Sequence, residues 1–438
     1  MAWLVRAAFL LYLVLVLAAI WIQDHTTALP LGLFNEGREA YDRLSAACLV
    51  LCAGVAALFA AEMIRRKPIP PAGALRGLIA SFLLLELLLL AADVTLVSRG
   101  ASSRLGGPYR ELASASGKWI WVKKAHAGSP YGFRTASPHA KRADRLRVLF
   151  LGDSYTEGSG SAPECNYPEV AARRLAERIG SPVEAINAGV GGYGPLDAGN
   201  LLEHLAAEGY AFDAVVYGLF LENDFTDNLP ATERRVVAGI NFRFPSSRFL
   251  RAFHPLNSRT FRYLLFVAQA SRLDPGTREQ VSRREGTCRV EGEKLAEMGD
   301  ALRSTVERRL DANYSPQASR AATAEVSRAL SGMEAVARRL GVPFVLVVFP
   351  DRILVDADLR RLLGRDLAAE GYDLERLRRW IEGSVQGPLV LDTAEVLSGG
   401  SEYYRSGDTH LSDLGNLVAG EWVGERLAQL LSPFGRGE

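Results

Sequence analysis

Long apolar runs fill most of the first hundred residues, whereas the rest of the chain alternates short apolar runs with mixed polar segments. Three of these runs have about the 20 residues that a helix needs to cross the hydrocarbon core of a membrane. We therefore predict transmembrane helices at residues 3–22, 46–64 and 78–97, which together form a membrane anchor over residues 1–97. Glu86 lies in the third helix, either as a relay or ligand site or as a protonated side chain bonded to another helix.

The charges of the connecting loops predict the orientation of this anchor. Residues 65–76 carry four positive charges, whereas the basic residues of the 23–44 loop are offset by acidic ones. Because Lys and Arg are enriched in cytoplasmic loops, the 65–76 loop is expected in the cytoplasm. The N-terminus is then cytoplasmic too, and everything after residue 98 lies on the outer, periplasmic or extracytoplasmic side of a multi-pass inner-membrane protein.

The pattern after the anchor predicts a linker and then an α/β domain. Residues 98–146 are rich in Ser, Gly, Pro and basic residues, and within them residues 119–122 are expected as a short strand or an interfacial contact. From residue 147 to residue 431, short Val-, Ile-, Leu- and Phe-rich runs alternate with helical segments, which favours a mostly parallel sheet covered by helices on both faces. Strands are expected at residues 147–151, 183–187, 214–220, 344–349 and 389–392. Helices are expected at about residues 167–179, 196–208, 318–340, 374–385 and 414–430.

One interval breaks this alternation. Residues 229–292 contain no obvious sheet strand, and insertions of this length in compact domains are usually lids, binding loops or partly disordered segments. Arginines and aromatic residues are interleaved in it. The insertion is either a cap that contacts an anionic glycan or a lipid surface, or a solvated helical hairpin with a phenylalanine core.

Composition argues against some classes of function. The net charge of +1 gives no support to a nucleic-acid partner. The six histidines are dispersed without metal-ligand spacing, so neither a metal nor another cofactor is expected. The four cysteines do not form a disulfide scaffold. For Cys165 and Cys288 unpaired thiols are the favoured interpretation, since pairing requires an oxidising compartment.

The first predicted strand runs directly into Gly152-Asp153-Ser154-Tyr155. A buried parallel strand that ends in a small, turn-forming segment delivers a side chain to the carboxyl edge of the sheet, where open α/β folds place their chemistry. Ser154 is therefore a candidate nucleophile. The same tetrapeptide also suits an ordinary turn or a helix N-cap.

A serine hydroxyl is a poor nucleophile until a neighbouring base removes its proton. Asp408-Thr409-His410 lies in a polar turn before the last predicted helix. His410 is the candidate general base because the unperturbed pKa of histidine lies near the working pH, and Asp408 is the candidate for orienting it. An isolated Asp-x-His pair is also common on protein surfaces by chance.

Acyl transfer also needs hydrogen-bond donors for the tetrahedral oxyanion. The glycine-rich segment 187–194 follows the second strand, and its backbone N–H groups can approach a substrate closely. Asn223 follows the third strand and adds an amide side chain at the same edge. Phosphate binding by the glycine-rich segment and helix capping by Asn223 are the alternatives.

These four segments occur in the order seen in the SGNH, or GDSL-type, hydrolase superfamily, and the chain resembles that superfamily over about residues 145–431. The resemblance implies a three-layer, flavodoxin-like α/β/α sandwich with a mostly parallel five-stranded sheet, and a serine hydrolase or acyltransferase mechanism. It implies Ser154 as the nucleophile, His410 as the general base and Asp408 as the acid that orients the base.

The same resemblance implies an oxyanion hole formed by the backbone amides of Ser154 and Gly192 and the side-chain amide of Asn223. Further candidate substrate contacts flank these positions, namely Asp153, Tyr155, Tyr193 and Asp224. Two features depart from the superfamily pattern. The acid stands two residues before the histidine, with Gly407 at the usual position, as in the SGNH-like domains of alginate O-acetyltransferases. Leu221 replaces a common glycine and is expected to narrow or reshape the pocket beside Asn223.

The expected function is the removal or transfer of acyl groups, acetyl above all, on exported or cell-surface glycans by a membrane-anchored enzyme. The expected partners are an acylated glycan or other ester and membrane components of a polysaccharide export or acylation system. One alternative is an esterase or lipase for lipid-derived acyl chains, which the membrane anchor and the Phe-rich insertion suggest. The other alternative is a catalytically silent SGNH-like module that binds or scaffolds a polysaccharide-assembly complex.

Overall fold

A computed structural model describes the chain from residue 109 onward, with gaps. The described residues are 109–113, 119–123, 129–133, 135, 139–227, 232–237, 240–245, 288, 295, 297–318, 320–385 and 387–431. The predicted transmembrane helices and Glu86 lie outside these residues. Within the described part, no helix has the length and apolar character needed to cross a membrane.

The chain divides into two compact units. One unit comprises Met1–Glu111 and Ala231–Arg278, and the other comprises Leu112–Pro230 and Glu279–Glu438. In the first unit, β6 (Thr232–Val237) and β7 (Ile240–Pro245) form an antiparallel hairpin. No obvious sheet strand is predicted in residues 229–292, and among the described residues the hairpin pairs only with itself and adds no strand to the main sheet.

The second unit is built around a five-stranded parallel sheet. Its strands lie in the order β4-β3-β5-β8-β9, which is the order of flavodoxin-like doubly wound sheets. Their bounds are Leu146–Gly152 for β3, Val183–Gly189 for β4, Ala214–Phe220 for β5, Phe344–Phe349 for β8 and Leu389–Asp392 for β9. The predicted parallel sheet and its five strands are therefore confirmed.

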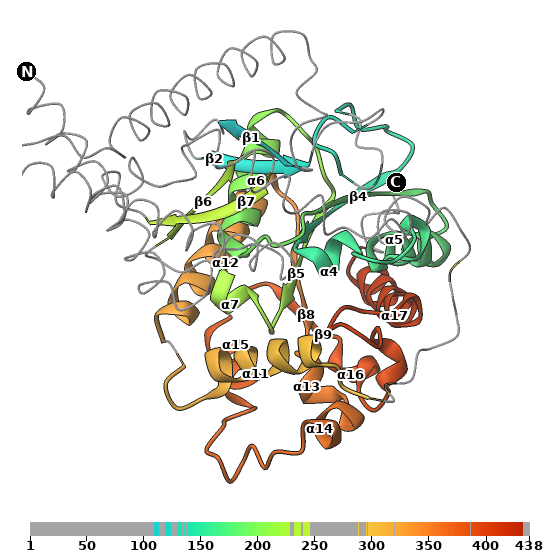
Figure 1. Cartoon of the computed structure of the whole chain (residues 1–438). Helices are drawn as coiled ribbons and strands as arrows, with labels where there is room; N and C mark the ends of the chain where they lie inside the picture. The colour runs from blue at the N-terminus through green and yellow to red at the C-terminus, as the bar shows by residue number, and fades with distance from the viewer. Residues whose placement is uncertain are drawn as a thin grey trace, which may run out of the picture. The chain divides into compact units, whose positions relative to one another are not determined.

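Helices cover both faces of this sheet (Figure 1). The helices α5 (Tyr167–Ile179) and α17 (Asp413–Leu431) pack together on one face, and their apolar residues share one core with the strands. The helices α6 (Pro195–Ala207) and α12 (Arg320–Leu340) pack together on the other face. Because helices cover it on both sides, the central strand β5 is buried along its whole length.

The remaining elements are short or lie outside the layers. The strand β2 (Trp119–Lys123) pairs with β1 (Tyr109–Ala113) and confirms the strand expected near residues 119–122. The other helices in the described residues are α4 (Ser154–Glu157), η2 (Pro163–Cys165), α7 (Asp224–Asp227), α11 (Asp300–Tyr314), α13 (Arg352–Val355), α14 (Ala357–Leu363), α15 (Arg376–Ser384), α16 (Ala394–Leu397) and η4 (Ser401–Tyr403).

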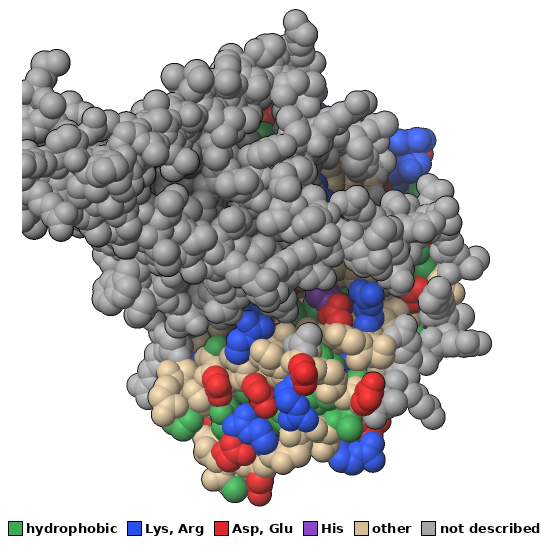
Figure 2. All heavy atoms as spheres, viewed as in Figure 1, with side chains coloured by type: hydrophobic (Ala, Val, Ile, Leu, Met, Phe, Trp, Pro, Cys, Tyr) green, Lys and Arg blue, Asp and Glu red, His purple; other side chains and the backbone are tan. Residues whose placement is uncertain are grey.

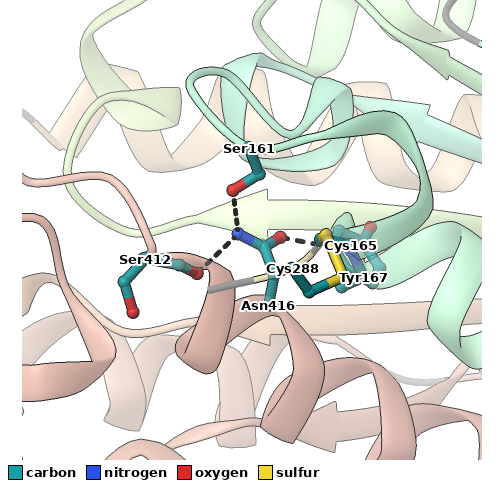
Figure 3. The surroundings of a disulfide bond; sticks show 6 residues. All are labelled: Ser161, Cys165, Tyr167, Cys288, Ser412 and Asn416. Atoms are coloured by element: carbon teal, nitrogen blue, oxygen red, sulfur yellow. Dashed lines mark hydrogen bonds between the residues drawn. A yellow bond between two sulfur atoms is a disulfide. The ribbon is translucent and has the colours of Figure 1, made fainter. Parts of the chain in front are cut away.

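A disulfide joins Cys165 to Cys288, whose Cα atoms are 5.5 Å apart (Figure 3). The favoured prediction of unpaired thiols is thus wrong. Beside the disulfide, the amide of Asn416 on α17 accepts a hydrogen bond from the backbone N–H of Tyr167 and donates to Ser161 Oγ. These bonds connect the start of α5 to α17, which begins three residues after His410.

Candidate active site

The carboxyl edge of the sheet presents Ser154 at the switch point of the strand order. The chain continues from β3 to β4 on one side of β3, and then to β5 on its other side. In doubly wound folds the crevice at such a point is the usual ligand site. Ser154 follows β3 directly, and the segment that carries Asn223 follows β5.

Local geometry fixes the turn that carries Ser154. Gly152 has a φ of +154°, and a Cβ atom on it would lie 2.1 Å from Thr156 Oγ1, so only glycine fits. Asp153 caps α4, accepting a hydrogen bond of 2.8 Å from the backbone N–H of Tyr155. The helix starts at once, and Ser154 stays partly exposed at its first position while Tyr155 is buried.

The structure brings Ser154, His410 and Asp408 together. The Nε2 atom of His410 lies 2.8 Å from Ser154 Oγ, and its Nδ1 atom lies 2.5 Å from Asp408 Oδ1. A carboxylate can only accept a hydrogen bond, so we assign the ring proton to Nδ1, which leaves the lone pair of Nε2 facing the serine hydroxyl. This is the arrangement that a nucleophile, a base and an orienting acid require.

Charge tunes this pair for base catalysis. Burial alone lowers the pKa of His410, but the hydrogen bond to Asp408 and the charges of Asp408, Asp153 and Glu222 raise that pKa above its usual value. Burial alone raises the pKa of Asp408, but its hydrogen bonds and its charge interaction with His410 hold that pKa well below its usual range. Asp408 is therefore ionised at neutral pH and stabilises the protonated imidazole.

Two of the three predicted oxyanion donors are backbone N–H groups. Gly192 has a φ of +80°, in the left-handed region that favours glycine. Its neighbours are engaged, since Gly191 N donates to Glu157 Oε2 and Tyr193 N donates to the Val190 carbonyl. Within the described residues, the N–H groups of Gly192 and Ser154 have no hydrogen-bond acceptor, so both can bind an oxyanion.

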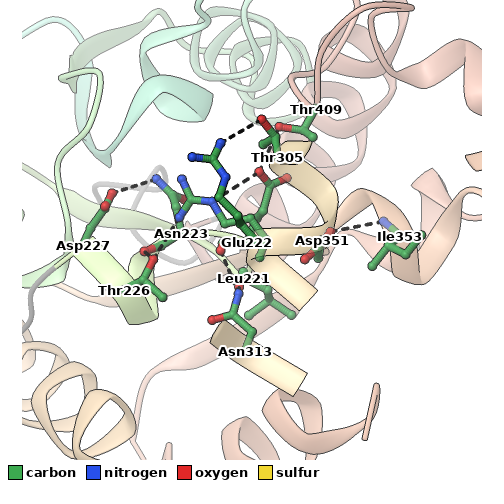
Figure 4. A network of polar contacts seen from close by, with 12 residues as sticks. Leu221, Glu222, Asn223, Thr226, Asp227, Thr305, Asn313, Asp351, Ile353 and Thr409 are labelled. Atoms are coloured by element: carbon green, nitrogen blue, oxygen red, sulfur yellow. Dashed lines mark hydrogen bonds and ion pairs between the residues drawn. The ribbon is translucent and has the colours of Figure 1, made fainter. Parts of the chain in front are cut away.

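The third predicted donor, the side chain of Asn223, is already engaged. Its Nδ2 atom donates to Asp153 Oδ2 at 3.1 Å and to Asp227 Oδ2 at 2.9 Å. Its Oδ1 atom is buried and has no hydrogen-bond partner among the residues that the structure describes. Figure 4 shows Asn223 pointing toward Asp227. A substrate oxyanion can therefore reach this amide only by sharing or displacing one of the two carboxylates.

The four predicted substrate contacts face the protein interior. Asp153 holds the Tyr155 N–H and Asn223, and burial raises its pKa to about 6 against the hydrogen bonds that lower it. The Tyr155 hydroxyl donates to the Thr409 carbonyl, and its ring stacks on Phe220. The remaining two contacts are internal as well: the Tyr193 hydroxyl donates to the Trp121 carbonyl, and Asp224 accepts from Tyr217 and Phe220 N. These internal bonds favour a role in shaping the site for all four, and their role as substrate contacts stays a prediction.

Sequence reasoning missed a second layer of polar residues around the site (Figure 4). Thr409 Oγ1 donates to Glu222 Oε1 at 3.1 Å, which links the two loops that carry His410 and Asn223. Arg309 from α11 approaches the same Glu222 oxygen at 3.9 Å. Burial raises the pKa of Glu222, while Arg309 and Thr409 act in the opposite direction. Glu222 adjoins Asn223 and Thr409 adjoins His410 in the sequence, but the sequence gives no sign that Glu222 and Thr409 pair.

The comparison with family models decides the classification. The model of the GDSL-like lipase/acylhydrolase family matches residues 150–374, which is more than half of the chain. The chain belongs to this family. The match includes Ser154, Gly192 and Asn223 and ends before Asp408 and His410. Membership makes the protein an ester-cleaving serine hydrolase and sets aside the catalytically silent alternative.

Several solved structures of the same kind are similar to this chain, while no curated protein matches it. One is the lipase Lip_vut3 from a goat rumen metagenome, with 14% identity and a TM-score of 0.35 over 65% of this chain and 97% of that one. Another is a carbohydrate acetylesterase family member from Sinorhizobium meliloti, with 12% identity and a TM-score of 0.32 over 65% and 99%. A third is a two-domain esterase active on acetylated mannans, with 12% identity and a TM-score of 0.31 over 67% and 51%. No conclusion about the substrate follows from likenesses this distant.

No metal site accompanies the serine chemistry in the part of the chain that the structure describes. There, no group of three or more His, Cys, Asp or Glu side chains is placed to hold a metal ion.

Replacement of Asn223 by alanine tests the third oxyanion donor. We expect kcat to fall by about 10²–10³-fold with little change in KM, because the developing oxyanion would take the place of Asp153 or Asp227 on Asn223 Nδ2, and the variant lacks that transition-state hydrogen bond. Steady-state kinetics on an aryl acetate measure this. The matched control is Asn313→Ala, because Asn313 Nδ2 donates to the Leu221 and Glu222 carbonyls and supports the same loop without reaching the site. A kcat loss no larger than that of the control would remove Asn223 from the oxyanion hole.

Proposed function

We propose that this chain is a membrane-anchored, extracytoplasmic serine esterase or O-acyltransferase that removes or transfers acetyl groups on exported or cell-surface glycans. The observation that carries the catalytic part is the single histidine ring that joins Ser154 Oγ at 2.8 Å to Asp408 at 2.5 Å. The acceptor and the location rest on the sequence pattern.

The geometry supports a two-step acyl transfer. His410 Nε2 removes the Ser154 proton while Oγ attacks the ester carbonyl carbon, and the N–H donors of Ser154 and Gly192 bind the oxyanion. The C–O bond of the ester then breaks, and His410 returns the proton to the leaving alcohol. A water molecule or an acceptor hydroxyl attacks the acyl-enzyme in the same way and regenerates Ser154. Hydrolysis and transfer differ only in this acceptor.

A short acyl group suits the described surface. A long acyl chain needs a contiguous apolar surface. Among the described residues, the exposed large hydrophobic side chains are Leu196 on α6 and Leu389 on β9, which belong to separate elements. Residues flanking Ser154, such as Tyr155 and Asn223, are buried. Most of the 229–292 insertion lies outside the described residues, so a lipid substrate remains the alternative for experiment to exclude.

The surface charges support a substrate of low net charge, and the disulfide supports a location outside the cytoplasm. On the face in Figure 2, acidic and basic side chains are intermingled over the described surface, so this face has no single-sign patch that would select a highly charged polymer. The Cys165–Cys288 disulfide suits an oxidising compartment such as the periplasm. This agrees with the orientation that the loop charges predict for the N-terminal anchor.

Acyl-chain selectivity tests the proposal. We expect kcat/KM for the 4-nitrophenyl ester of acetate to exceed that of octanoate by at least ~10-fold, because a site shaped for acetyl rejects added methylenes. The same preparation is expected to release acetate from an acetylated polysaccharide, and Ser154→Ala is the control for both assays. Adding a de-acetylated polysaccharide to the aryl acetate reaction separates transfer from hydrolysis. Preference for octanoate would replace the acetyl proposal with the lipid-ester alternative.

A further inference from the structure

The loop that carries Asp408 and His410 has internal bonds, among them Asp408 N to the Arg405 carbonyl at 3.3 Å and His410 N to Asp408 Oδ1 at 2.8 Å. Residues 405–410 lie between Tyr404 and Leu411, which form an isolated antiparallel bridge. Arg405 N donates to the His410 carbonyl at 3.0 Å and closes the loop. A loop of this kind keeps a fixed shape only if its remaining carbonyl groups find donors elsewhere.

A buried arginine supplies those donors. Arg352 is the first residue of α13, directly after the segment that follows β8, and its side chain is 0% exposed. Its Nη1 atom donates to the carbonyl oxygens of Arg405 at 2.7 Å and Asp408 at 2.6 Å. Its Nε atom donates to the equally buried Asp356 at 2.8 Å, and its guanidinium lies over the Tyr404 ring.

The two hydrogen bonds from Arg352 fix the backbone of the loop next to the catalytic Asp408 and His410. They bind the first carbonyl of the loop and the carbonyl of the orienting acid itself. The next carbonyl, that of Thr409, accepts from the Tyr155 hydroxyl, whose residue adjoins Ser154. The backbone on both sides of Asp408 is therefore tied to the sheet edge that carries the nucleophile.

We propose that Arg352 is a positioning residue: by binding the Arg405 and Asp408 carbonyls, its guanidinium sets the distance and angle at which His410 meets Ser154. This inference rests on the catalytic roles proposed above for these residues. Arginine suits the task because its planar fork offers several donors in a rigid arrangement, whereas lysine offers a single flexible ammonium group. Asp356 neutralises the buried charge and orients the fork.

A purely structural role is the competing explanation, and the chain contains a matched control for it. Arg147 at the start of β3 is also 0% exposed and pairs with Glu184 at 2.8 Å. It also donates to two carbonyl oxygens, those of His139 and Ala140. It lies at the opposite end of β3 from Ser154, so Arg147→Lys reproduces the loss of a buried fork without touching the catalytic loop.

The experiment compares Arg352→Lys with Arg147→Lys in the full chain. For Arg352→Lys we expect kcat on an aryl acetate to fall by about 10²-fold, the cost of a misplaced catalytic group, with KM unchanged. The acid limb of the kcat/KM profile should move to lower pH, because His410 loses the close carboxylate that raises its pKa. Labelling of Ser154 by a fluorophosphonate should slow in parallel. Arg147→Lys should lower Tm but leave kcat and the pH profile within about twofold of wild type.

A second variant keeps the test decisive if Arg352→Lys does not fold. Asp356→Asn retains the oxygen that caps α14 through Leu359 N but turns an amide toward Arg352 Nε, which displaces the fork. We expect a smaller kcat loss with the same shift of the acid limb. Unchanged kcat and pH profile in the folded Arg352 or Asp356 variant would overturn the inference. Full activity of Ser154→Ala would instead overturn the proposed function, so the two failures are distinguishable.

Discussion

Replacement of Ser154 by alanine is expected to lower kcat on an aryl acetate by about 10⁶-fold, the scale of loss when a catalytic serine is removed. The reason is that Oγ forms the acyl-enzyme and is the hydroxyl that lies 2.8 Å from His410 Nε2. Residual activity should come only from water attacking a substrate held by the N–H donors. The loss of kcat is measured from the rate of aryl alcohol release, by stopped-flow or steady-state kinetics.

Ser159→Ala is the control for this variant. Ser159 is a partly exposed serine five residues further on, and its backbone N–H donates to the Ser154 carbonyl, a bond that the substitution keeps. Its kcat should equal that of the wild type within about twofold. Substantial hydrolysis by Ser154→Ala would mean that another residue is the nucleophile.

Replacement of Asp408 by asparagine has the second largest expected effect. We expect kcat to fall by about 10⁴-fold, because asparagine stabilises the wrong histidine tautomer and leaves the protonated imidazole without a counter-charge. Unlike the serine variant, this enzyme should still form an acyl-enzyme slowly. The geometry behind the expectation is the contact of Asp408 Oδ1 with both His410 Nδ1 and His410 N.

The pH dependence of Asp408→Asn carries a definite sign. His410 acts as a base in its neutral form, so kcat/KM of the wild type rises as pH increases through a pKa that lies above the usual 6.5. Without the hydrogen bond and charge of Asp408, the two largest contributions that raise this pKa are lost while burial still lowers it, so the acid limb moves to lower pH. Asp413→Asn, a change three residues after His410, should leave the limb in place. An unshifted limb in Asp408→Asn would show that Asp408 does not orient His410.

The sheet could be predicted from the sequence with good precision. The strands at 214–220, 344–349 and 389–392 were predicted with the bounds they have, because each is a short apolar run between turn residues. The meeting of Ser154 with His410, which lie 256 residues apart, followed from the order of the motifs in a known superfamily. The local sequence pattern around each residue alone predicts neither the contact between Ser154 and His410 nor its distance.

Features that depend on long-range pairing could not be predicted. The helix α11 (Asp300–Tyr314) was missed because its sequence is mostly polar, yet it brings Arg309 to Glu222. The arginine that binds the catalytic loop, Arg352, has no local signature for that role, since the two loop carbonyls that it binds lie more than fifty residues away. The prediction for Cys165 and Cys288 failed for the same reason. Two cysteines separated by 123 residues give no local sign that their Cα atoms lie 5.5 Å apart.

The central claim is that Ser154 becomes covalently acylated with His410 as its base. Mass spectrometry of the protein after treatment with a fluorophosphonate tests this most directly, with proteolysis to locate the adduct. The claim predicts one adduct, on Ser154, that is absent in Ser154→Ala and forms much more slowly in His410→Ala. An adduct on another residue, or continued ester hydrolysis by protein whose Ser154 is fully modified, would contradict it.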